Sequence, residues 1–585
     1  MRVHDLRSPA AVVGSPAPLT TRSILVPAVS LRQELTLRVL VLATVAAGAW
    51  FWLWWLASGH GSWTSPLGAV STVLLAWVFL MPTYFLFFTC RMTRPDLRVP
   101  LPALRLAMVV TKAPSEPWAV VRATLEAMLA QDYPSAYDVW LADERPTTET
   151  LAWCAERRVH VSTRFGAEDY QRPTWPRRTK SKEGNLAYFY DTVGYRDYDV
   201  VVQLDCDHVP DSSYLVAMVR PFAAPVVGYT CAPSICDSNA DMGWTVRGRL
   251  YREATLHGPM QAGANGGYAP VCIGSHYAVR TAALESVGGL GPELAEDYST
   301  TLWFQSGGWD GVFVLDAEAH GAGPATVDEL LTQESQWARS LGTLLTKWLP
   351  GRVRGVPWRA RVRMGFSLFF YLVMGVMLTV ATVLPIMGVL LRQSWGHTSL
   401  VAFYVHMWAY SLLVLGTAIY VRHLHVFRPR DAKLWSWEAI LFQLVRWPWT
   451  FGCFLQGMYF GWRSRTKPFK VTPKGASEES LLSARWLVPM FVLGAIPAWV
   501  VVLTPPTDLV LGPALLCVVE CATYLLAMLT IIVLHLARNY RSAGVPVPAS
   551  GIPTRHSVTL GVTVLFLGAL LTLSELALRI THGLV

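Results

Sequence analysis

Seven long apolar segments constrain the fold of this chain more than any other feature. Each is long enough to cross the hydrocarbon core of a bilayer as a helix. With 52% hydrophobic and only 15% charged residues among 585, the chain is too apolar for an ordinary soluble protein. We therefore expect a multi-span membrane protein with its spans at about 39–56, 68–89, 365–391, 398–421, 486–503, 509–536 and 557–579.

Basic residues define the expected orientation of these spans. The loop between the first two spans holds no Lys or Arg, whereas arginines flank the pair on its outer sides, namely Arg32 and Arg38 before it and Arg91, Arg94 and Arg98 after it. By the positive-inside rule, the amino terminus and the region after Arg91 face the cytoplasm. The net charge of +9 therefore indicates membrane flanks, and we expect no nucleic-acid partner.

One further apolar segment, residues 434–462, is not counted as a span. Arg446, Pro448 and five tryptophans interrupt its apolar pattern, and basic stretches flank it on both sides. Two cytoplasmic flanks are incompatible with a single crossing, so we expect a helix that lies in the membrane interface.

These patterns divide the chain into five regions. We expect a mobile cytoplasmic arm at 1–36, two transmembrane helices at 37–91, a soluble domain at 92–350, interface helices with two further spans and a loop at 351–483, and C-terminal transmembrane helices at 484–585. The nine cysteines show no ligand spacing, so neither a disulfide framework nor a cysteine metal site is expected.

The soluble region alternates apolar strands with amphipathic helices. Strands are predicted at 104–114, 138–144 and 200–204, with a helix at 117–131 between the first two. Such alternation is typical of an α/β domain with a mostly parallel sheet. Ligands of such sheets gather at the carboxyl ends of the strands, which is where Asp143 and Asp205 fall.

Asp205 and Asp207 directly follow the third of these strands. Two carboxylates two residues apart suit Mg²⁺ or Mn²⁺, whose coordination shell the phosphates of a substrate can complete. An isolated Asp-x-Asp is also typical of a turn in which Asp caps backbone amides. The neighbouring motifs decide between these interpretations.

Further polar motifs stand in a fixed order around this pair. They are Thr111 to Glu116, Asp143, Lys182-Glu-Gly184-Asn185, Asp205-Cys-Asp207, Gly274-Ser275, Glu296-Asp297, Gln333-x-x-x-Trp337 and, far downstream, Phe469-Lys-Val471-Thr472-Pro-Lys474-Gly475. Over residues 37–540 this series resembles the membrane-embedded processive family 2 glycosyltransferases, most closely the cellulose and curdlan synthase branch. The resemblance implies an α/β cytoplasmic domain of the glycosyltransferase A type, inserted in an α-helical multi-span membrane domain.

The resemblance also implies a role for each motif. Asp297 matches the general base of a T-E-D motif in which Ala295 here replaces Thr, and an inverting transfer needs such a carboxylate to accept the proton of the incoming hydroxyl. The other implied roles are metal binding by Asp205 and Asp207; UDP binding by Thr111, Glu116, Asp143, Lys182, Asn185 and Asp205; acceptor binding by Gln333, Trp337, Gly274 and Ser275; and a gating loop with Phe469, Val471, Thr472 and Lys474.

One position departs from the pattern. The stretch from Gln333 to Trp337 resembles the family's Q-x-x-R-W, but Gln336 stands in place of the Arg. The change removes a cation that would stabilise the negative charge of the leaving diphosphate. Arg339 and Lys347 are the nearby candidates to replace it.

The expected function is that of a processive inverting β-glycosyltransferase of the cytoplasmic (inner) membrane. It would polymerise a UDP-sugar, most simply UDP-glucose, into a β-glucan and translocate the growing polysaccharide acceptor across the bilayer, with Mg²⁺ or Mn²⁺ and an accessory export subunit as partners. Glu520 and His406, which fall within predicted spans, are compatible with a sugar channel. Open alternatives are a β-1,3-glucan, mixed-linkage, chitin-like or hyaluronan-like product, single addition to a lipid, or a silent glycan conduit or scaffold.

Overall fold

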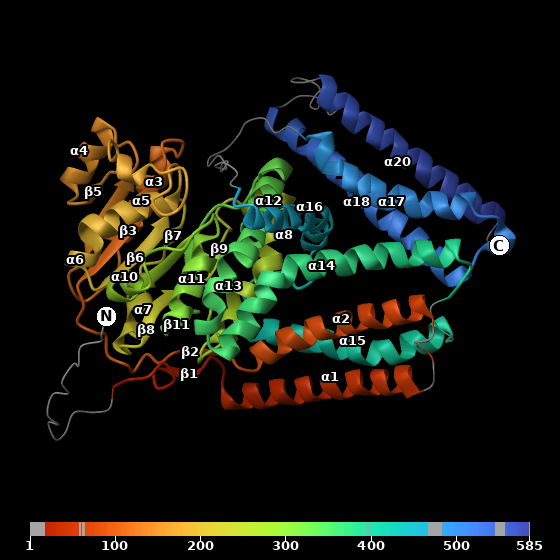
Figure 1. The fold of residues 1–585 in the computed structure, drawn as a ribbon, viewed down its shortest axis with the longest axis horizontal. Coiled ribbons are helices and arrows are strands. Elements are labelled where there is room, and N and C mark those ends of the chain that lie inside the picture. The colour runs from red at the N-terminus through yellow and green to blue at the C-terminus, as the bar shows by residue number, and fades with distance from the viewer. Residues whose placement is uncertain are drawn as a thin grey trace.

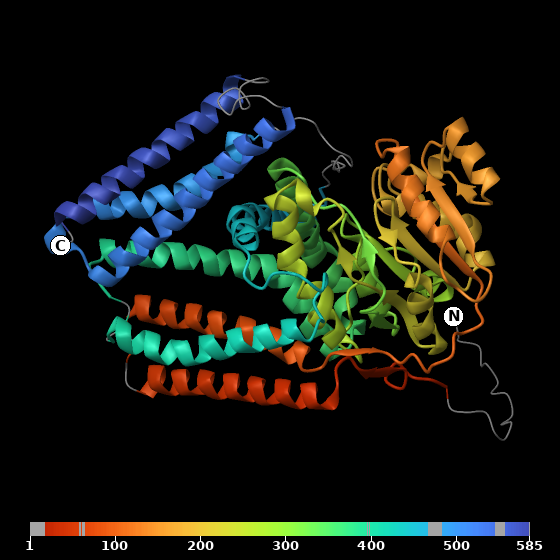
Figure 2. The same ribbon diagram turned by 180° about the vertical axis from the view of Figure 1, so that it is seen from behind.

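The computed structural model describes residues 18–57, 60, 65–394, 396, 398–465, 482–543 and 556–583. An α/β domain occupies one end of the molecule and long helices occupy the other (Figure 1). Seen from behind, the same long helices run away from the α/β domain in two groups (Figure 2). The amino-terminal part of the chain passes beneath the α/β domain before it enters the first long helix.

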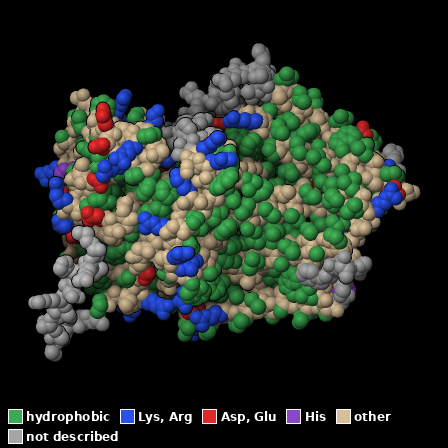
Figure 3. All heavy atoms as spheres, viewed as in Figure 1, with side chains coloured by type: hydrophobic (Ala, Val, Ile, Leu, Met, Phe, Trp, Pro, Cys, Tyr) green, Lys and Arg blue, Asp and Glu red, His purple; other side chains and the backbone are tan. Residues whose placement is uncertain are grey.

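Seven of the described helices are long and apolar enough to cross a membrane, which confirms the expected number. Apolar side chains cover the surface of this half of the molecule, whereas charged side chains gather on the α/β domain (Figure 3). The chain is therefore a multi-pass membrane protein, with spans in α1 (Leu31–Ala57), α2 (Pro66–Thr89), α14 (Trp358–Leu390), α15 (Leu400–His423), α17 (Ala484–Leu503), α18 (Leu511–Ala543) and α20 (His556–Gly583).

Helix α16 (Trp437–Trp462) is not one of these seven. It is seen end-on where the spans are seen lengthwise, so it lies across them (Figure 1). Its position in the membrane interface stays a prediction. Pro448 stands inside this helix without ending it. The helix packs on α12 (Val327–Thr343) and α8 (Trp244–Glu253) of the α/β domain and on α14 of the membrane region.

Glycines bring α12 and α16 into backbone contact. A Cβ at Gly457 of α16 would collide with the carbonyl oxygen of Arg339, and one at Gly342 of α12 would collide with the carbonyl oxygen of Phe454. Because neither position can hold a side chain, the two helices are fixed against each other at close range.

The α/β domain is built on a seven-stranded sheet. Only β10 runs antiparallel to its neighbours, so the sheet is mostly parallel, as predicted. The strand order is β11 (Asp310–Phe313), β8 (Val227–Cys231), β10 (His276–Arg280), β6 (Val200–Asp205), β3 (Leu106–Lys112), β4 (Asp138–Asp143) and β5 (His160–Ser162).

Apolar residues on the central strands alternate between two cores. Val109 and Val201 face one core, whereas Val110 and Val202 face the other. The first core continues into Leu368 at the base of α14, so the sheet and the membrane helices share buried apolar surface. That sharing fixes the α/β domain to the membrane part of the molecule.

The register of the three central strands aligns their carboxyl ends. Thr111 of β3 lies opposite Asp205 of β6 on one side and Ala142 of β4 on the other. Antiparallel β10 begins at the same edge, because His276 lies opposite Leu204. The segment before β10 is thereby delivered to the ends of the parallel strands.

Helices and short strands complete this domain. The predicted helix at 117–131 is α3 (Trp118–Leu129). The remaining elements are helices α4 (Thr148–Glu156), α5 (Lys182–Phe189), α6 (Tyr195–Asp197), α7 (Tyr214–Val219), α9 (Gln261–Ala264), α10 (Thr281–Ser286), α11 (Glu296–Ser306) and α13 (Leu349–Arg352), and a small sheet of β7 (Val209–Pro210), β12 (Ala319–His320) and β9 (Ser234–Ile235).

The expectation of a mobile arm over residues 1–36 is wrong for the part that the structure describes. Strand β1 (Leu25–Pro27) pairs antiparallel with β2 (Thr93–Pro95), and the hydroxyl of Thr21 donates to the carboxylate of Asp310 at 2.6 Å. Backbone pairing with a distant segment leaves no periodic signal in the sequence, which explains the error. The nine cysteines are all free, as expected.

We predict that Gly457→Ala lowers the free energy of unfolding by roughly 1–3 kcal/mol, the usual cost of overpacking, because the new methyl group meets the backbone of α12. Thermal unfolding of the detergent-solubilised protein measures the change. Gly452→Ala is the matched control, since a Cβ there meets no atom within 4 Å and lies on the same helix. Equal effects of the two substitutions would contradict the close backbone contact.

Candidate functional site

Strand β6 ends on Asp205, which is held by Lys182 from the first turn of α5. The ammonium of Lys182 lies 2.7 Å from Oδ1 of Asp205 and donates to the carbonyl oxygen of Gly274 at 2.6 Å. Ser181 caps α5 by accepting from the N–H of Gly184, which fixes the position of Lys182. One cation thereby joins the end of β6 to the segment before β10.

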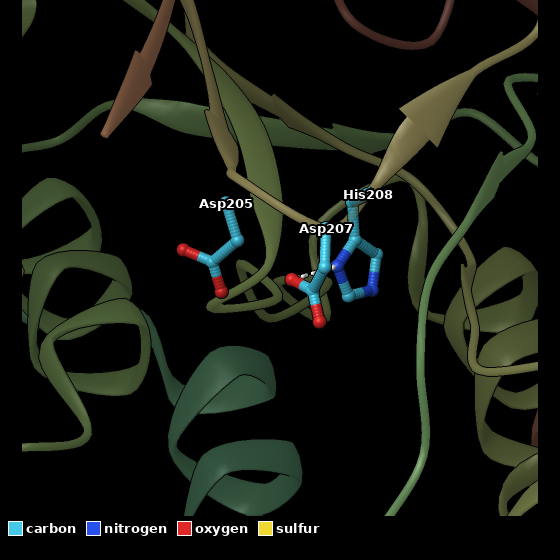
Figure 4. A group of neighbouring side chains, drawn as sticks. All are labelled: Asp205, Asp207 and His208. Carbon is cyan, nitrogen blue, oxygen red and sulfur yellow. Dashed lines mark hydrogen bonds and ion pairs between the residues drawn. The ribbon is translucent and has the colours of Figure 1, made fainter. Parts of the chain in front are cut away.

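Asp207 and His208 follow Asp205 (Figure 4). Nδ1 of His208 lies 3.2 Å from Oδ1 of Asp207, and its Nε2 lies 3.1 Å from the hydroxyl of Ser234. Possible ligand atoms of Asp205, Asp207 and His208 all lie within 4.8 Å of one another. Because both nitrogens of the buried His208 ring are engaged, the carboxylates of Asp205 and Asp207 are the better ligands, and His208 orients Asp207.

These two carboxylates fit a divalent cation of the hard class. Carboxylate oxygen suits Mg²⁺ and Mn²⁺, and both ions accept substrate phosphates as further ligands. The side chain of Asp205 is 30% exposed, whereas that of Asp207 is 9% exposed. A bound ion would therefore be reached by substrate from the side of Asp205.

Asp297 stands in the first turn of α11, beside Gly274. Its Oδ1 accepts from the N–H of Tyr298 at 2.7 Å, and a Cβ at Gly274 would lie 3.0 Å from its Oδ2. Burial raises the pKa of Asp297 above its ordinary value. Burial, followed by the charge of Asp297, likewise raises the pKa of the adjacent Glu296. The structure therefore brings Asp297 to the group formed by Asp205, Lys182 and Gly274.

The residues expected to bind UDP lie along the same edge of the sheet. Thr111 neighbours Asp205 across β3 and β6, and Glu116 closes the following loop by accepting from the N–H of Ala113 at 2.8 Å. Asp143 is fully buried, with the ammonium of Lys112 3.3 Å away. Asn185 is also buried and donates to the carbonyl oxygen of Ala142 at 2.7 Å. Sequence reasoning missed the pairing of Asp143 with Lys112, although the Lys directly follows Thr111.

Gln333 and Trp337 lie on α12, at the other end of the site. Nη1 of Arg249, on α8, donates to Oε1 of Gln333 at 2.9 Å, and its guanidinium lies 4.7 Å from the centre of a Trp337 ring. Gln336 is buried in the same helix. Nothing in the sequence near Arg249 indicates this contact, because 84 residues separate it from Gln333.

Neither candidate replacement for the Arg missing at Gln336 lies where it was expected. Arg339 donates to Gln456 of α16 at 2.7 Å, and the ammonium of Lys347 lies 4.8 Å from the centre of a Trp348 ring. Both therefore contact other parts of the molecule. The cations that contact this motif are Arg249, at Gln333 and Trp337, and Arg446 of α16, whose Nη1 lies 2.7 Å from Oε2 of Glu334.

A chain of polar contacts joins the carboxylate pair to this motif. The hydroxyl of Ser234 contacts His208. The backbone N–H of Ser234 donates to Nδ1 of His257 at 3.4 Å. His257 lies 3.6 Å from Glu253, and Glu253 lies 3.1 Å from Nε of Arg249. The two ends of the site are thus linked through buried and half-buried polar groups.

Ser275 belongs to the same cluster, because its carbonyl oxygen accepts from the N–H of Asp205 at 2.7 Å. Ser275 precedes β10, and its hydroxyl lies 3.0 Å from Nδ1 of His276. The gating-loop residues Phe469, Val471, Thr472 and Lys474 lie outside the described residues, so their role stays a prediction.

The two polar residues within spans have different surroundings. Glu520 of α18 contacts Thr382 of α14. His406 of α15 instead stacks on Trp50 and Trp54 of α1, with ring centres 4.4 and 4.0 Å apart. Of the two, only Glu520 faces the helices that lie next to α16.

The α/β domain thus carries a carboxylate pair and a buried carboxylate at the ligand edge of a mostly parallel sheet. A sequence model described as "Glycosyltransferase like family 2" matches residues 102–340. These residues are therefore similar to family 2 glycosyltransferases, and the chain is also similar to cellulose synthases.

The curated relatives are bacterial cellulose synthases. The chain is 28% identical over 314 residues to the cellulose synthase catalytic subunit (UDP-forming) of Xanthomonas axonopodis pv. citri (strain 306), a match that covers 50% of this chain and 40% of that protein. It is 27% identical over 259 residues to cellulose synthase 1 of Komagataeibacter xylinus, covering 42% of this chain and 16% of that protein. The match thus spans less than half the length of these relatives.

Solved structures are more distant. A mannosyltransferase from Pyrobaculum calidifontis in complex with GDP-Man and Mn²⁺ is 15% identical with a TM-score of 0.43, covering 68% of this chain and 100% of that one. Glucosyl-3-phosphoglycerate synthase from Mycobacterium tuberculosis is 14% identical with a TM-score of 0.27, covering 44% of this chain and 81% of that one. Likenesses of this strength assign no substrate to this chain.

We predict that Asp207→Asn weakens Mn²⁺ binding at least about tenfold, because it replaces one anionic carboxylate ligand by a neutral amide and weakens the charge-assisted contact with His208. Electron paramagnetic resonance of Mn²⁺, titrated into the purified protein with UDP present, measures the affinity. Asp211→Asn is the control, since Asp211, Glu318 and His320 form a second, more exposed group with possible ligand geometry. Loss of binding in the control alone would move the metal site to that group.

Proposed function

We propose that this chain is a processive inverting β-glycosyltransferase that extends a β-linked glucan from UDP-glucose and passes the polymer across the cytoplasmic membrane. The observation that carries the proposal is the convergence of Asp205, Lys182 and Asp297 around Gly274, at the sheet edge where β6 and the segment before β10 meet. The UDP donor is supported by the similarity to the Xanthomonas cellulose synthase catalytic subunit, which is UDP-forming.

Asp297 serves as the general base. It accepts the proton of the acceptor hydroxyl as that oxygen forms the new bond to the anomeric carbon and the diphosphate leaves from the opposite face, which inverts the configuration. The burial that raises the pKa of Asp297 makes it a stronger base than an exposed aspartate. Only the ionised form accepts the proton, so activity is lost as the pH falls through this raised pKa.

Asp205, Asp207 and Lys182 stabilise the leaving diphosphate. A divalent cation held by the two carboxylates would supply positive charge against the phosphate oxygens. Lys182 adds a fixed cation beside Asp205, already aimed by its bond to Gly274. Charge that is positioned before the reaction needs no reorganisation during it.

Gln333 and Trp337 hold the acceptor end of the polymer. An indole covers the C–H face of a pyranose without requiring a fixed hydrogen-bond direction, which suits a chain that must slide. Arg249 fixes both side chains at once, by a hydrogen bond to Gln333 and by its position over Trp337. It is a positioning residue that supplies, from α8, a cation near the place where Gln336 lacks one.

The path across the membrane begins next to this motif. Helix α12 carries Trp337, packs on α16 and through it approaches α14 and α18. Glu520 faces α14 at membrane depth, and a carboxylate there requires a protein interior or a polar path. The arginines that flank the first two spans support a cytoplasmic position of the α/β domain.

We predict that inverted membrane vesicles with Mg²⁺ or Mn²⁺ incorporate labelled UDP-glucose into high-molecular-weight polymer. Asp297→Asn lowers the rate by about 10²–10⁴-fold, the usual contribution of a general base. Asp241→Asn, a change at an exposed aspartate of the same domain, retains the rate.

Parallel reactions with UDP-N-acetylglucosamine and UDP-glucuronate test the donor, and linkage-specific hydrolases test the product. If polymer forms from another donor instead, the product is not a glucan and the proposed donor is wrong. A short lipid-soluble product would replace processive synthesis by single addition. Full activity of Asp297→Asn would refute its role as the base.

We predict that Arg249→Gln lowers polymer formation about tenfold or more but leaves the hydrolysis of UDP-glucose to glucose unchanged, because the donor site keeps all its side chains. Arg249→Lys restores part of the loss, since an ammonium keeps the charge but not the planar contact with Trp337. Radiolabelled polymer and free glucose are measured in the same reaction. An equal fall in both products would show that Arg249 acts on the donor side.

A further inference from the structure

A cavity of about 470 Å³ lies between the amino-terminal segment and the adjoining ends of the first two spans. Its wall is formed by β1 and the start of α1, by the end of α2 with β2, and by Arg359 of α14. The catalytic, metal-binding and acceptor residues proposed above are not among its lining residues. It is therefore separate from the glycosyltransferase site.

The cavity wall has an excess of positive charge. Four arginines and one glutamate line it, and only Arg38 pairs with that glutamate, Glu34. Among the residues that the structure describes, Arg22, Arg91 and Arg359 have no acidic partner within ion-pair distance. Three cations around one cavity repel each other, which raises the electrostatic free energy. An anion bound between them would offset this repulsion.

Aromatic contact holds two of these arginines in place. The guanidinium groups of Arg91 and Arg359 lie 4.9 and 5.8 Å from the centre of the Tyr268 ring. Planar guanidinium groups held this way suit the oxygens of a phosphate ester. The cavity thus has a fixed cationic wall.

The cavity lies at the level of lipid headgroups. Arg38 directly precedes the apolar stretch at 39–56, Arg91 follows the last residue of α2 by two positions, and Arg359 is the second residue of α14. Basic side chains gather where the apolar surface ends near the beginning of α1 (Figure 3). Each of these arginines therefore stands where a spanning helix leaves the hydrocarbon.

An apolar stripe on α1 leads away from the cavity. Leu35, Val39 and Leu42 recur at helical spacing, and 51%, 65% and 68% of their surfaces are exposed. Leu37 and Met92 line the cavity itself beside the arginines. A soluble anion would leave this stripe uncovered, whereas the acyl chains of a lipid would pack against it.

We propose that this cavity binds the headgroup phosphate of an anionic phospholipid, whose acyl chains lie along the stripe of Leu35, Val39 and Leu42. The bound lipid joins β1, β2 and three spanning helices at one point. It anchors the amino-terminal segment to the membrane surface beneath the α/β domain.

The test is lipid binding to the full-length protein in detergent, measured by native mass spectrometry. Phosphatidylglycerol is titrated against phosphatidylcholine and against soluble glycerol 3-phosphate. The wild type retains phosphatidylglycerol preferentially. The double variant Arg22→Gln and Arg91→Gln binds it roughly 25-fold more weakly, at about fivefold for each arginine near the membrane surface.

A second double variant, Arg354→Gln and Arg463→Gln, removes the same charge from exposed arginines outside the cavity and leaves binding unchanged. Arg91→Lys keeps most of the affinity because the charge remains. Equal weakening in both double variants, or equal binding of phosphatidylcholine, would overturn the site. Glycerol 3-phosphate binding as tight as that of phosphatidylglycerol would overturn the lipid.

Discussion

Backbone pairing between β6, β3 and β4 is the constraint on which the rest of the site depends. The register that places Thr111 opposite both Asp205 and Ala142 makes three strands end at one level. Antiparallel β10 then begins at that level, so Gly274 arrives next to Asp205 without a long loop. A shift of one residue in any strand would turn these side chains to the opposite face of the sheet.

Charges at that edge, buried or half-buried, are held by neighbouring side chains. Lys182 satisfies Asp205, His208 satisfies Asp207, and Lys112 satisfies Asp143. Buried charges without partners would cost several kcal/mol each, so the pairs allow the polar edge to exist inside a folded domain. Because the pairs are made without a ligand, the polar edge is already arranged in the form that the proposed function requires.

The sequence predicted what local patterns determine. Apolar length placed the seven spans, strand-end carboxylates placed Asp205 and Asp207, and Arg446 with Pro448 separated α16 from the spans. Contacts between distant segments were missed, such as Arg249 on Trp337, β1 on β2, and His406 between two tryptophans of α1. Such contacts depend on which surfaces of distant helices and strands pack against each other, and a single sequence does not specify that packing.

The glycines between α12 and α16 bear on how a polymer could move. Backbone contact at Gly342 and Gly457 leaves α12 no room to slide along α16, so Trp337 keeps a constant position relative to that helix. Under the proposed function, a growing polymer would advance past a stationary Trp337 ring by one sugar for each bond formed, and no movement of α12 would carry it. The polymer would then move by the length of one sugar at each step, a distance that no displacement of a helix determines.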